Sequence, residues 1–327
     1  MTHKENHGGA GHGVDRRSFM KQAATVAAVG ASAPLLLDSQ VAQAAPTSKS
    51  AAETAVKRFY ASLSEKQSKA ICFGFDHPLR SRINANWHVT KPEIGDDFYS
   101  DDQRAMINEI LKGVTSEDGY GRLQKQMDED AGGVNFFSVA MFGNPEQGKF
   151  EWELTGRHLT LRADGNSVDK VAFGGPIVYG HGEEDAKQNL FYGQTKQVNK
   201  VFKALDGKQA QAALLARAPK ENAVKLQGKQ GAFPGLSVGD MSSDQVELVE
   251  ETLKFLLAPY RQEDVDEVMS IVKASGGLES LNMAFYKQGD LDNDSMWDMW
   301  RIEGPSFVWH FRGAPHVHAY INIGHAG

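Results

Sequence analysis

Apolar residues follow two periodicities along this chain, one helical and one that alternates from residue to residue. Ile107, Ile110 and Leu111 keep the spacing of one helix face within residues 101–112, whereas residues 150–154 alternate between large apolar residues and glutamate. The first pattern predicts an amphipathic helix, and the second predicts a β-strand with one buried face. Because helix patterns precede strand patterns twice along the chain, the sequence predicts an α+β fold.

The predicted helices begin at polar residues that can cap the free N–H groups of the first turn. Ser64 and Asp206 are each followed three residues later by a glutamine, as in a capping box. The predicted helices are residues 51–63, 101–112, 117–129, 194–205, 243–257 and 262–273, with two more that begin at Ser64 and Asp206. The predicted strands are residues 135–142, 150–154, 157–162, 168–173, 281–286, 296–303, 307–312 and 316–323.

Three short motifs occur twice in the same order, which indicates an internal duplication. The pairs are residues 63–67 and 205–209, 100–103 and 242–245, and 152–156 and 300–304. The first two pairs share one offset of 142 positions (63 to 205, 100 to 242), and the third is separated by a few residues more. We therefore predict two pseudo-repeats packed as one domain, each with paired helices and an antiparallel β-hairpin sheet.

The predicted halves are residues 45–173 and 194–327, joined by a linker loop at 174–193. Residues 1–44 are expected to be a signal peptide. Within them, DRRSFMK at 15–21 resembles a twin-arginine export signal, and Ala-Gln-Ala at 42–44 resembles a cleavage site. The resemblance implies delivery by the twin-arginine export machinery to the periplasm or the extracellular space. The hydrophobic run of the signal is too short for a stable membrane anchor.

Composition and missing motifs exclude several classes of function. The chain of 327 residues carries a formal net charge of -7, so no nucleic-acid partner is expected. Its single cysteine, Cys72, excludes an internal disulfide and a cysteine-rich zinc site. The sequence contains no Walker loop, no strand-linked G-x-G-x-x-G and no G-x-S-x-G motif, so we expect no nucleotide cofactor and no serine nucleophile.

Histidines concentrate in the last predicted hairpin. His316 and His318 are expected to share a face, because alternate strand residues point to the same side. A three-residue loop after Arg312 would place His310 opposite His318 and Arg312 opposite His316. The corresponding hairpin of the first half carries His158, and a twofold relation would bring this residue towards the other two.

Clustered imidazoles are typical ligands of zinc, copper and iron. We therefore predict a divalent metal centre at His158, His316 and His318, with His310 and His181 as further candidate ligands. A metal ion that is held by three neutral histidines and keeps one open position is able to activate water or dioxygen. The alternative is that these histidines pair with backbone groups or carboxylates on a solvated sheet face.

Charged residues near the histidines are candidates for further roles. Glu153 and Glu303 are candidate catalytic bases or metal ligands. Glu303 also shares a strand face with Arg301, which favours an exposed ion pair. Arg157 and Arg312 flank the histidines and are candidates for binding an anionic substrate.

Several motifs together resemble a bacterial family with no assigned activity, the domain of unknown function number thirty-five hundred. These motifs are Asn86-Trp87-His88, Trp152 to Leu159, Phe173 to Pro176, the helix start at 205–209 and the terminal His316-Val317-His318. Members of that family typically show two adjacent histidines where this chain has Arg157-His158. They also continue past the H-x-H motif into a tail with Arg, Asp and Pro, which this chain lacks. The resemblance implies no reaction.

The sequence thus predicts an exported protein with a histidine metal centre. One interpretation is a metalloenzyme, an oxidoreductase or hydrolase that acts on an unknown small molecule. The alternative is a non-catalytic periplasmic protein that binds metal or carbohydrate. Trp152, Trp300 and Trp309 are candidates to line a sugar or aromatic-ligand surface, although large aromatic residues on strands usually belong to the core. A third interpretation is a scaffold whose histidines are surface groups.

Overall fold

The computed structural model describes residues 45–183 and 185–325, which belong to one compact unit. The predicted twin-arginine signal at residues 1–44 lies outside the described residues. Among the helices of the described part, none has the length and apolar character that a membrane span requires.

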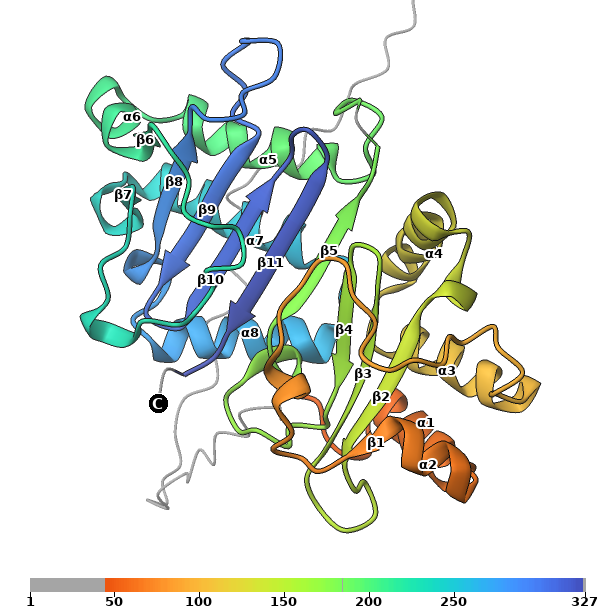
Figure 1. Ribbon diagram of the computed structural model, residues 1–327. Helices are drawn as coiled ribbons and strands as arrows, with labels where there is room; N and C mark the ends of the chain where they lie inside the picture. The colour runs from red at the N-terminus through yellow and green to blue at the C-terminus, as the bar shows by residue number, and fades with distance from the viewer. Residues whose placement is uncertain (1–44, 184, 326–327) are drawn as a thin grey trace, which may run out of the picture. The chain divides into compact units, whose positions relative to one another are not determined.

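The described residues form a mixed sheet of eleven strands at the centre of this unit (Figure 1). Its order is β1-β2-β3-β4-β5-β11-β10-β9-β8-β6, and β7 pairs with β8. The strands are β1 (Cys72–Phe73), β2 (Ser138–Gly143), β3 (Phe150–Gly156), β4 (Leu159–Ala163), β5 (Ile177–His181), β6 (Leu214–Leu215), β7 (Leu236–Ser237), β8 (Asn282–Tyr286), β9 (Met299–Gly304), β10 (Phe307–Arg312) and β11 (Val317–Ile323). The α+β class is therefore confirmed, and the two predicted sheets are continuous through β5 and β11.

Helices pack on one face of the sheet (Figure 1). They are α1 (Ala51–Ala61), α2 (Glu65–Ile71), α3 (Asp101–Gly113), α4 (Glu117–Ala131), α5 (Tyr192–Lys203), α6 (Gly207–Ala213), α7 (Ser243–Leu257) and α8 (Gln262–Ala274). The apolar residues predicted for one face of α3 are buried with Trp152, Trp300 and Trp309 in one large core. The three tryptophans are fully buried, which contradicts a role as an exposed sugar-stacking surface.

The opposite face of the sheet carries polar side chains and is crossed by two irregular segments, residues 74–99 and 216–235 (Figure 1). Side chains of the sheet bond to the backbone of these segments. Arg301 donates to the carbonyl of Ala223 at 2.7 Å, and Thr155 accepts the N–H of Val89 at 2.8 Å. The irregular segments therefore provide partners for polar groups that would otherwise be buried alone.

One predicted strand is wrong. Residues 168–170 form a bend and a turn, Val171 makes one isolated bridge to Gly324, and Ala172–Gly174 form a 3-10 helix. The carboxylate of Asp164 accepts the N–H groups of Asn166 and Val168, which competes with strand pairing at the start of this segment. The strand of this region is instead β5, which lies inside the segment expected to be a linker loop. The linker boundaries at 174–193 are corrected accordingly, because α5 also begins within them.

The predicted capping boxes at Ser64 and Asp206 are present. Their glutamines also reach a second helix start. Gln67 donates to Gln103 at 2.8 Å, and Gln209 donates to Gln245 at 3.0 Å. Gln103 and Gln245 in turn complete capping boxes of α3 and α7. Each pair of glutamines thus fixes two helix N-termini against each other.

Replacing Gln103 by alanine tests this linkage. The change removes its bonds to the N-cap backbone of α3, to Gln67 and to the carbonyl of Ser62. We expect the free energy of unfolding to fall by about 1–2 kcal/mol, as for the loss of a helix cap in a buried site. Urea unfolding followed by tryptophan fluorescence measures this, with the exposed Gln147→Ala as control. Equal stability of the two variants would contradict the assignment.

Candidate metal centre

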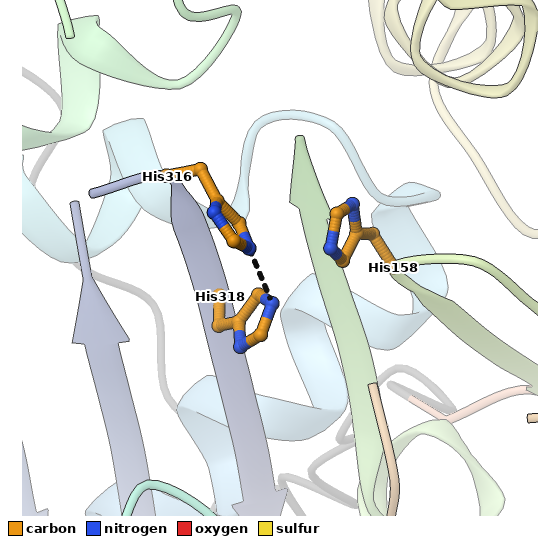
Figure 2. A group of neighbouring side chains, drawn as sticks. All are labelled: His158, His316 and His318. Atoms are coloured by element: carbon orange, nitrogen blue, oxygen red, sulfur yellow. Dashed lines mark hydrogen bonds between the residues drawn. The ribbon is translucent and has the colours of Figure 1, made fainter. Parts of the chain in front are cut away.

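Three histidines from distant parts of the chain meet at one end of the central strand pair, on the polar face of the sheet (Figure 2). His318 lies in β11, His316 directly precedes that strand, and His158 lies in the turn between β3 and β4. One ring nitrogen from each lies within 4.8 Å of the others. The structure therefore brings together the three residues that the sequence singled out.

The backbone leaves room for the ring of His158. Strand β5 lies between β4 and β11, and its residue Gly180 pairs with His318. A Cβ at Gly180 would lie 3.1 Å from the Cβ of His158 and would collide with the carbonyl oxygen of Val317. His158 itself has a φ of 57°, in the left-handed region that residues other than glycine rarely adopt. Its backbone N–H donates to the Ala85 carbonyl at 2.6 Å. The chain thus holds this side chain over β5 in a defined direction.

Carboxylates orient two of the imidazoles. Nδ1 of His158 lies 2.8 Å from Asp130, and Nδ1 of His318 lies 2.9 Å from Glu221. An ionised carboxylate only accepts hydrogen bonds, so each Nδ1 carries the proton and each Nε2 has a free lone pair. The Nε2 atoms of His316 and His318 are 3.0 Å apart. This arrangement matches histidine ligands whose outer nitrogen is held by a carboxylate.

Further hydrogen bonds hold the two carboxylates. Asp130, at the end of α4, accepts the N–H of Gly182 at 2.6 Å and the amide of Gln126 at 2.8 Å. Glu221 accepts from Arg312 at 3.2 Å. Val224, three residues further on, is fully buried, which anchors the irregular segment that carries Glu221.

The electrostatics favour the neutral forms of His316 and His318 and the ionised forms of Asp130 and Glu221 at neutral pH. Burial, together with the nearby His318 and Arg312, lowers the pKa of His316 to about 4. Burial also lowers the pKa of His318 by more than its bond to Glu221 raises it. For Asp130 burial acts to raise the pKa, but hydrogen bonds, first of all from His158, outweigh it and hold the pKa below its usual value. These are the protonation states that metal ligation requires.

Two of the candidate histidines lie apart from this group. His181 bonds through Nε2 to Glu129 at 2.8 Å. His310 is buried opposite Tyr320, because the last hairpin pairs Arg312 with His318. The predicted three-residue loop is therefore wrong, and the pairing of β10 with β11 is shifted by two residues from the predicted register. A shift of two leaves every side chain on its expected face but moves His310 away from His318.

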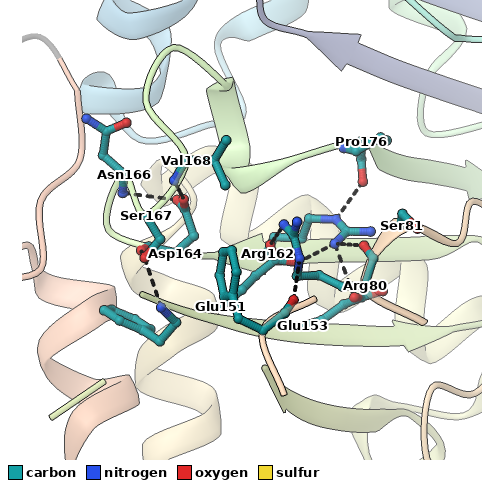
Figure 3. A network of polar contacts seen from close by, with 12 residues as sticks. Arg80, Ser81, Glu151, Glu153, Arg162, Asp164, Asn166, Ser167, Val168 and Pro176 are labelled. Carbon is teal, nitrogen blue, oxygen red and sulfur yellow. Dashed lines mark hydrogen bonds and ion pairs between the residues drawn. The ribbon is translucent and has the colours of Figure 1, made fainter. Parts of the chain in front are cut away.

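The candidate glutamates also lie outside the histidine group. Glu153 lies 3.2 Å from Arg162 in a buried charge network with Glu151 (Figure 3), and burial raises the pKa of Glu153 to about 8. Glu303 bonds to Arg301 at 2.6 Å. The predicted ion pair of Glu303 is confirmed, but it is buried rather than exposed.

Both candidate arginines lie close to the histidines. Nη2 of Arg312 is 3.3 Å from Nε2 of His316. Arg157 is exposed, and its charge contributes to the lowered pKa of His316. Positive charge therefore borders the histidine group from both halves of the sheet.

The sequence interpretation missed Asp130 and Glu221. Asp130 ends a run of three acidic residues in the last turn of α4, where no basic residue is present. Negative charge opposes the helix dipole at that end, so the run was a usable signal for a functional carboxylate. Glu221 lies in a segment without periodicity and gave no comparable signal.

Comparison with known proteins identifies the family but no activity. No curated protein and no solved structure matches the chain. A family model described as "Protein of unknown function (DUF3500)" matches residues 45–322, a range that contains the three histidines and both of their carboxylate partners. The match spans most of the sequence, and the chain belongs to this family of proteins of unknown function.

Proposed function

We propose that His158, His316 and His318 bind one divalent zinc, copper or iron ion, and that the protein is a metalloenzyme. The observation that carries the proposal is the convergence of three imidazoles, two of them held by carboxylates through Nδ1. In a tetrahedral site with metal–nitrogen bonds of about 2.0–2.1 Å, ligand nitrogens lie roughly 3.3 Å apart. The 3.0 Å separation of the Nε2 atoms of His316 and His318 is close to this value.

Three ligands favour catalysis over a structural role. Among the described residues the group contains three histidines and no fourth ligand. A tetrahedral ion would therefore keep one position for water or substrate, as catalytic zinc sites do. Because Arg157 and Arg312 lie beside the histidine group, we expect a small anionic substrate, and an oxidation or a hydrolysis as the reaction.

The proposal extends to export and to the origin of the fold. The twin-arginine signal predicted at residues 15–21 supports transport of the folded protein out of the cytoplasm. The paired glutamines support an internal duplication, because Gln67–Gln103 and Gln209–Gln245 differ by the same 142 positions (67 to 209, 103 to 245). The strand order, which runs alike outward from β5 and from β11, supports it further.

Metal content tests the centre directly. We expect about one equivalent of zinc, copper or iron in protein purified without chelators or a histidine tag, as measured by elemental analysis. His316→Ala with His318→Ala should abolish retention without unfolding the protein, whereas the exposed His88→Ala should leave the metal in place. A wild-type protein that retains no ion after reloading with each metal would make the histidines structural. Bound metal without turnover of any substrate would favour the non-catalytic binding protein.

The carboxylates that hold the imidazoles give a second test. Asp130→Asn and Glu221→Gln should each weaken metal affinity by about 10- to 100-fold, because the ring loses its orientation and basicity. Competition with a chelator of known affinity measures the change. Glu129→Gln is the matched control, since Glu129 neighbours Asp130 in α4 but bonds to His181. Equal weakening in the control would show that the helix end, and not the Asp130–His158 pair, is responsible.

Export is tested separately. Replacing Arg16 and Arg17 by lysine should stop delivery to the periplasm, because the export machinery recognises the arginine pair. Immunoblots of cytoplasmic and periplasmic fractions measure this, with Lys4→Arg as a control outside the signal motif. Undiminished export of the double-lysine variant would contradict the signal assignment.

A further inference from the structure

A pocket of about 540 Å³ adjoins the histidine group on the polar face of the sheet. It lies between the irregular segment at residues 218–222 and strands β9, β10 and β11. Glu221 and Arg312 line it, and both also contact the histidine group. The volume falls in the range of small-molecule binding sites, roughly 300–1,000 Å³.

Two buried polar atoms of the pocket wall have no hydrogen-bond partner among the residues that the structure describes. These are Nε of Arg312 and Nδ1 of His310. His310 is 1% exposed, and two neighbouring groups, Nη1 of Arg301 and the Tyr286 hydroxyl, are also buried without a partner. Arg301 and Tyr286 lie behind the pocket wall, whereas His310 and Arg312 line it. Unpaired buried polar groups destabilise a fold, so the two in the wall point to a bound polar molecule.

The free atoms are donors, whereas the nearby carboxylates are already paired. Nη1 of Arg312 donates to Glu221, and Nη2 lies 3.3 Å from Nε2 of His316. A metal bound at that Nε2 would replace the second contact, and Nε lacks a partner within the described part of the chain in either case. Both oxygens of Glu221 accept bonds, one from Arg312 and the other from His318. Burial lowers the pKa of His310 to about 3, so its ring is neutral and is able to present an N–H at Nδ1.

The chemistry of the wall selects one class of ligand. Two free donors match the two oxygens of a carboxylate, and the guanidinium supplies the opposite charge. Lys220 adds a second positive charge on the irregular segment. Met299 and Pro219 give the pocket apolar surface that suits the carbon body of an organic acid.

We propose that this pocket binds the carboxylate of a small organic acid through Arg312 and His310, and that it is the substrate pocket of the histidine centre. Its role as the substrate pocket rests on the proposed metalloenzyme function. Binding of the carboxylate itself requires no metal, so the two proposals fail independently.

The test measures binding of butyrate and succinate by isothermal titration calorimetry, to wild-type protein with zinc and to protein stripped of metal. Butyramide and inorganic phosphate serve as matched probes that lack a carboxylate. We expect both acids to bind both forms, and butyramide and phosphate to bind at least tenfold more weakly. Equal binding of the amide or of phosphate would overturn the carboxylate assignment, and no binding of either acid would overturn the pocket.

Variants identify the residues. His310→Phe keeps an aromatic ring at this position but removes Nδ1. It should therefore weaken acid binding by about tenfold while the metal content stays unchanged. Lys220→Glu is an exposed change that cannot disturb the core, and it should also weaken binding, whereas Lys229→Glu in the same irregular segment should not. Unchanged acid affinity in both His310→Phe and Lys220→Glu would refute the proposal. If the wild-type protein binds the acids but takes up no metal on reloading, the metal centre alone would be refuted.

Discussion

The antiparallel pairing of β5 with β11 is the contact on which the rest of the structure depends. It joins the two hairpin sheets into one, with partners that run from Ile177–Ile321 to His181–Val317. The same register places Gly180 beside His318, and the missing side chain at Gly180 admits the ring of His158. A slip of one residue would turn His318 to the helical face and put a side chain in that space, so the histidine group and the register of this pair are one constraint.

Burying the polar face of the sheet costs free energy unless its side chains find hydrogen-bond partners, and the two irregular segments supply these partners. They supply backbone carbonyls and N–H groups to side chains such as Arg301 and Thr155. A small apolar cluster holds both segments in place, with Ala85 from the first, Val224 from the second, and Val178 between them. Because Ala85 bonds to His158 and Val224 lies close in sequence to Glu221, the packing of these segments also sets the geometry of the histidine group.

The proposed centre and the proposed pocket share Arg312 and Glu221. Arg312 contacts Glu221 through Nη1 and His316 through Nη2, and its Nε is buried without a partner among the described residues. A ligand paired with that nitrogen would lie beside the histidines. Its charged group would leave water for protein hydrogen-bond donors, in surroundings of low dielectric constant where the attraction between opposite charges is stronger. Orientation of the imidazoles and recognition of an anion would then depend on the same guanidinium.

The sequence by itself determined the local structure of this protein. Capping boxes located the helix starts at Ser64 and Asp206, and alternation placed His316 and His318 on one face, because these features depend on neighbours a few residues apart. The duplicated motifs also suggested that His158 approaches the other two histidines, and the structure brings the three together. The acidic end of α4 also carried a signal for Asp130, because negative charge opposes the helix dipole there.

Only the tertiary structure decided the rest. The role of β5, the register of the last hairpin and the place of Glu221 depend on pairings between residues far apart in the sequence, and no local pattern encodes them. The burial of Glu153 and Glu303 beside arginines was equally hidden, since alternation shows that two residues share a face but not what covers that face. Short-range periodicity therefore determined which side chains share a face, and long-range packing determined which residues those side chains contact.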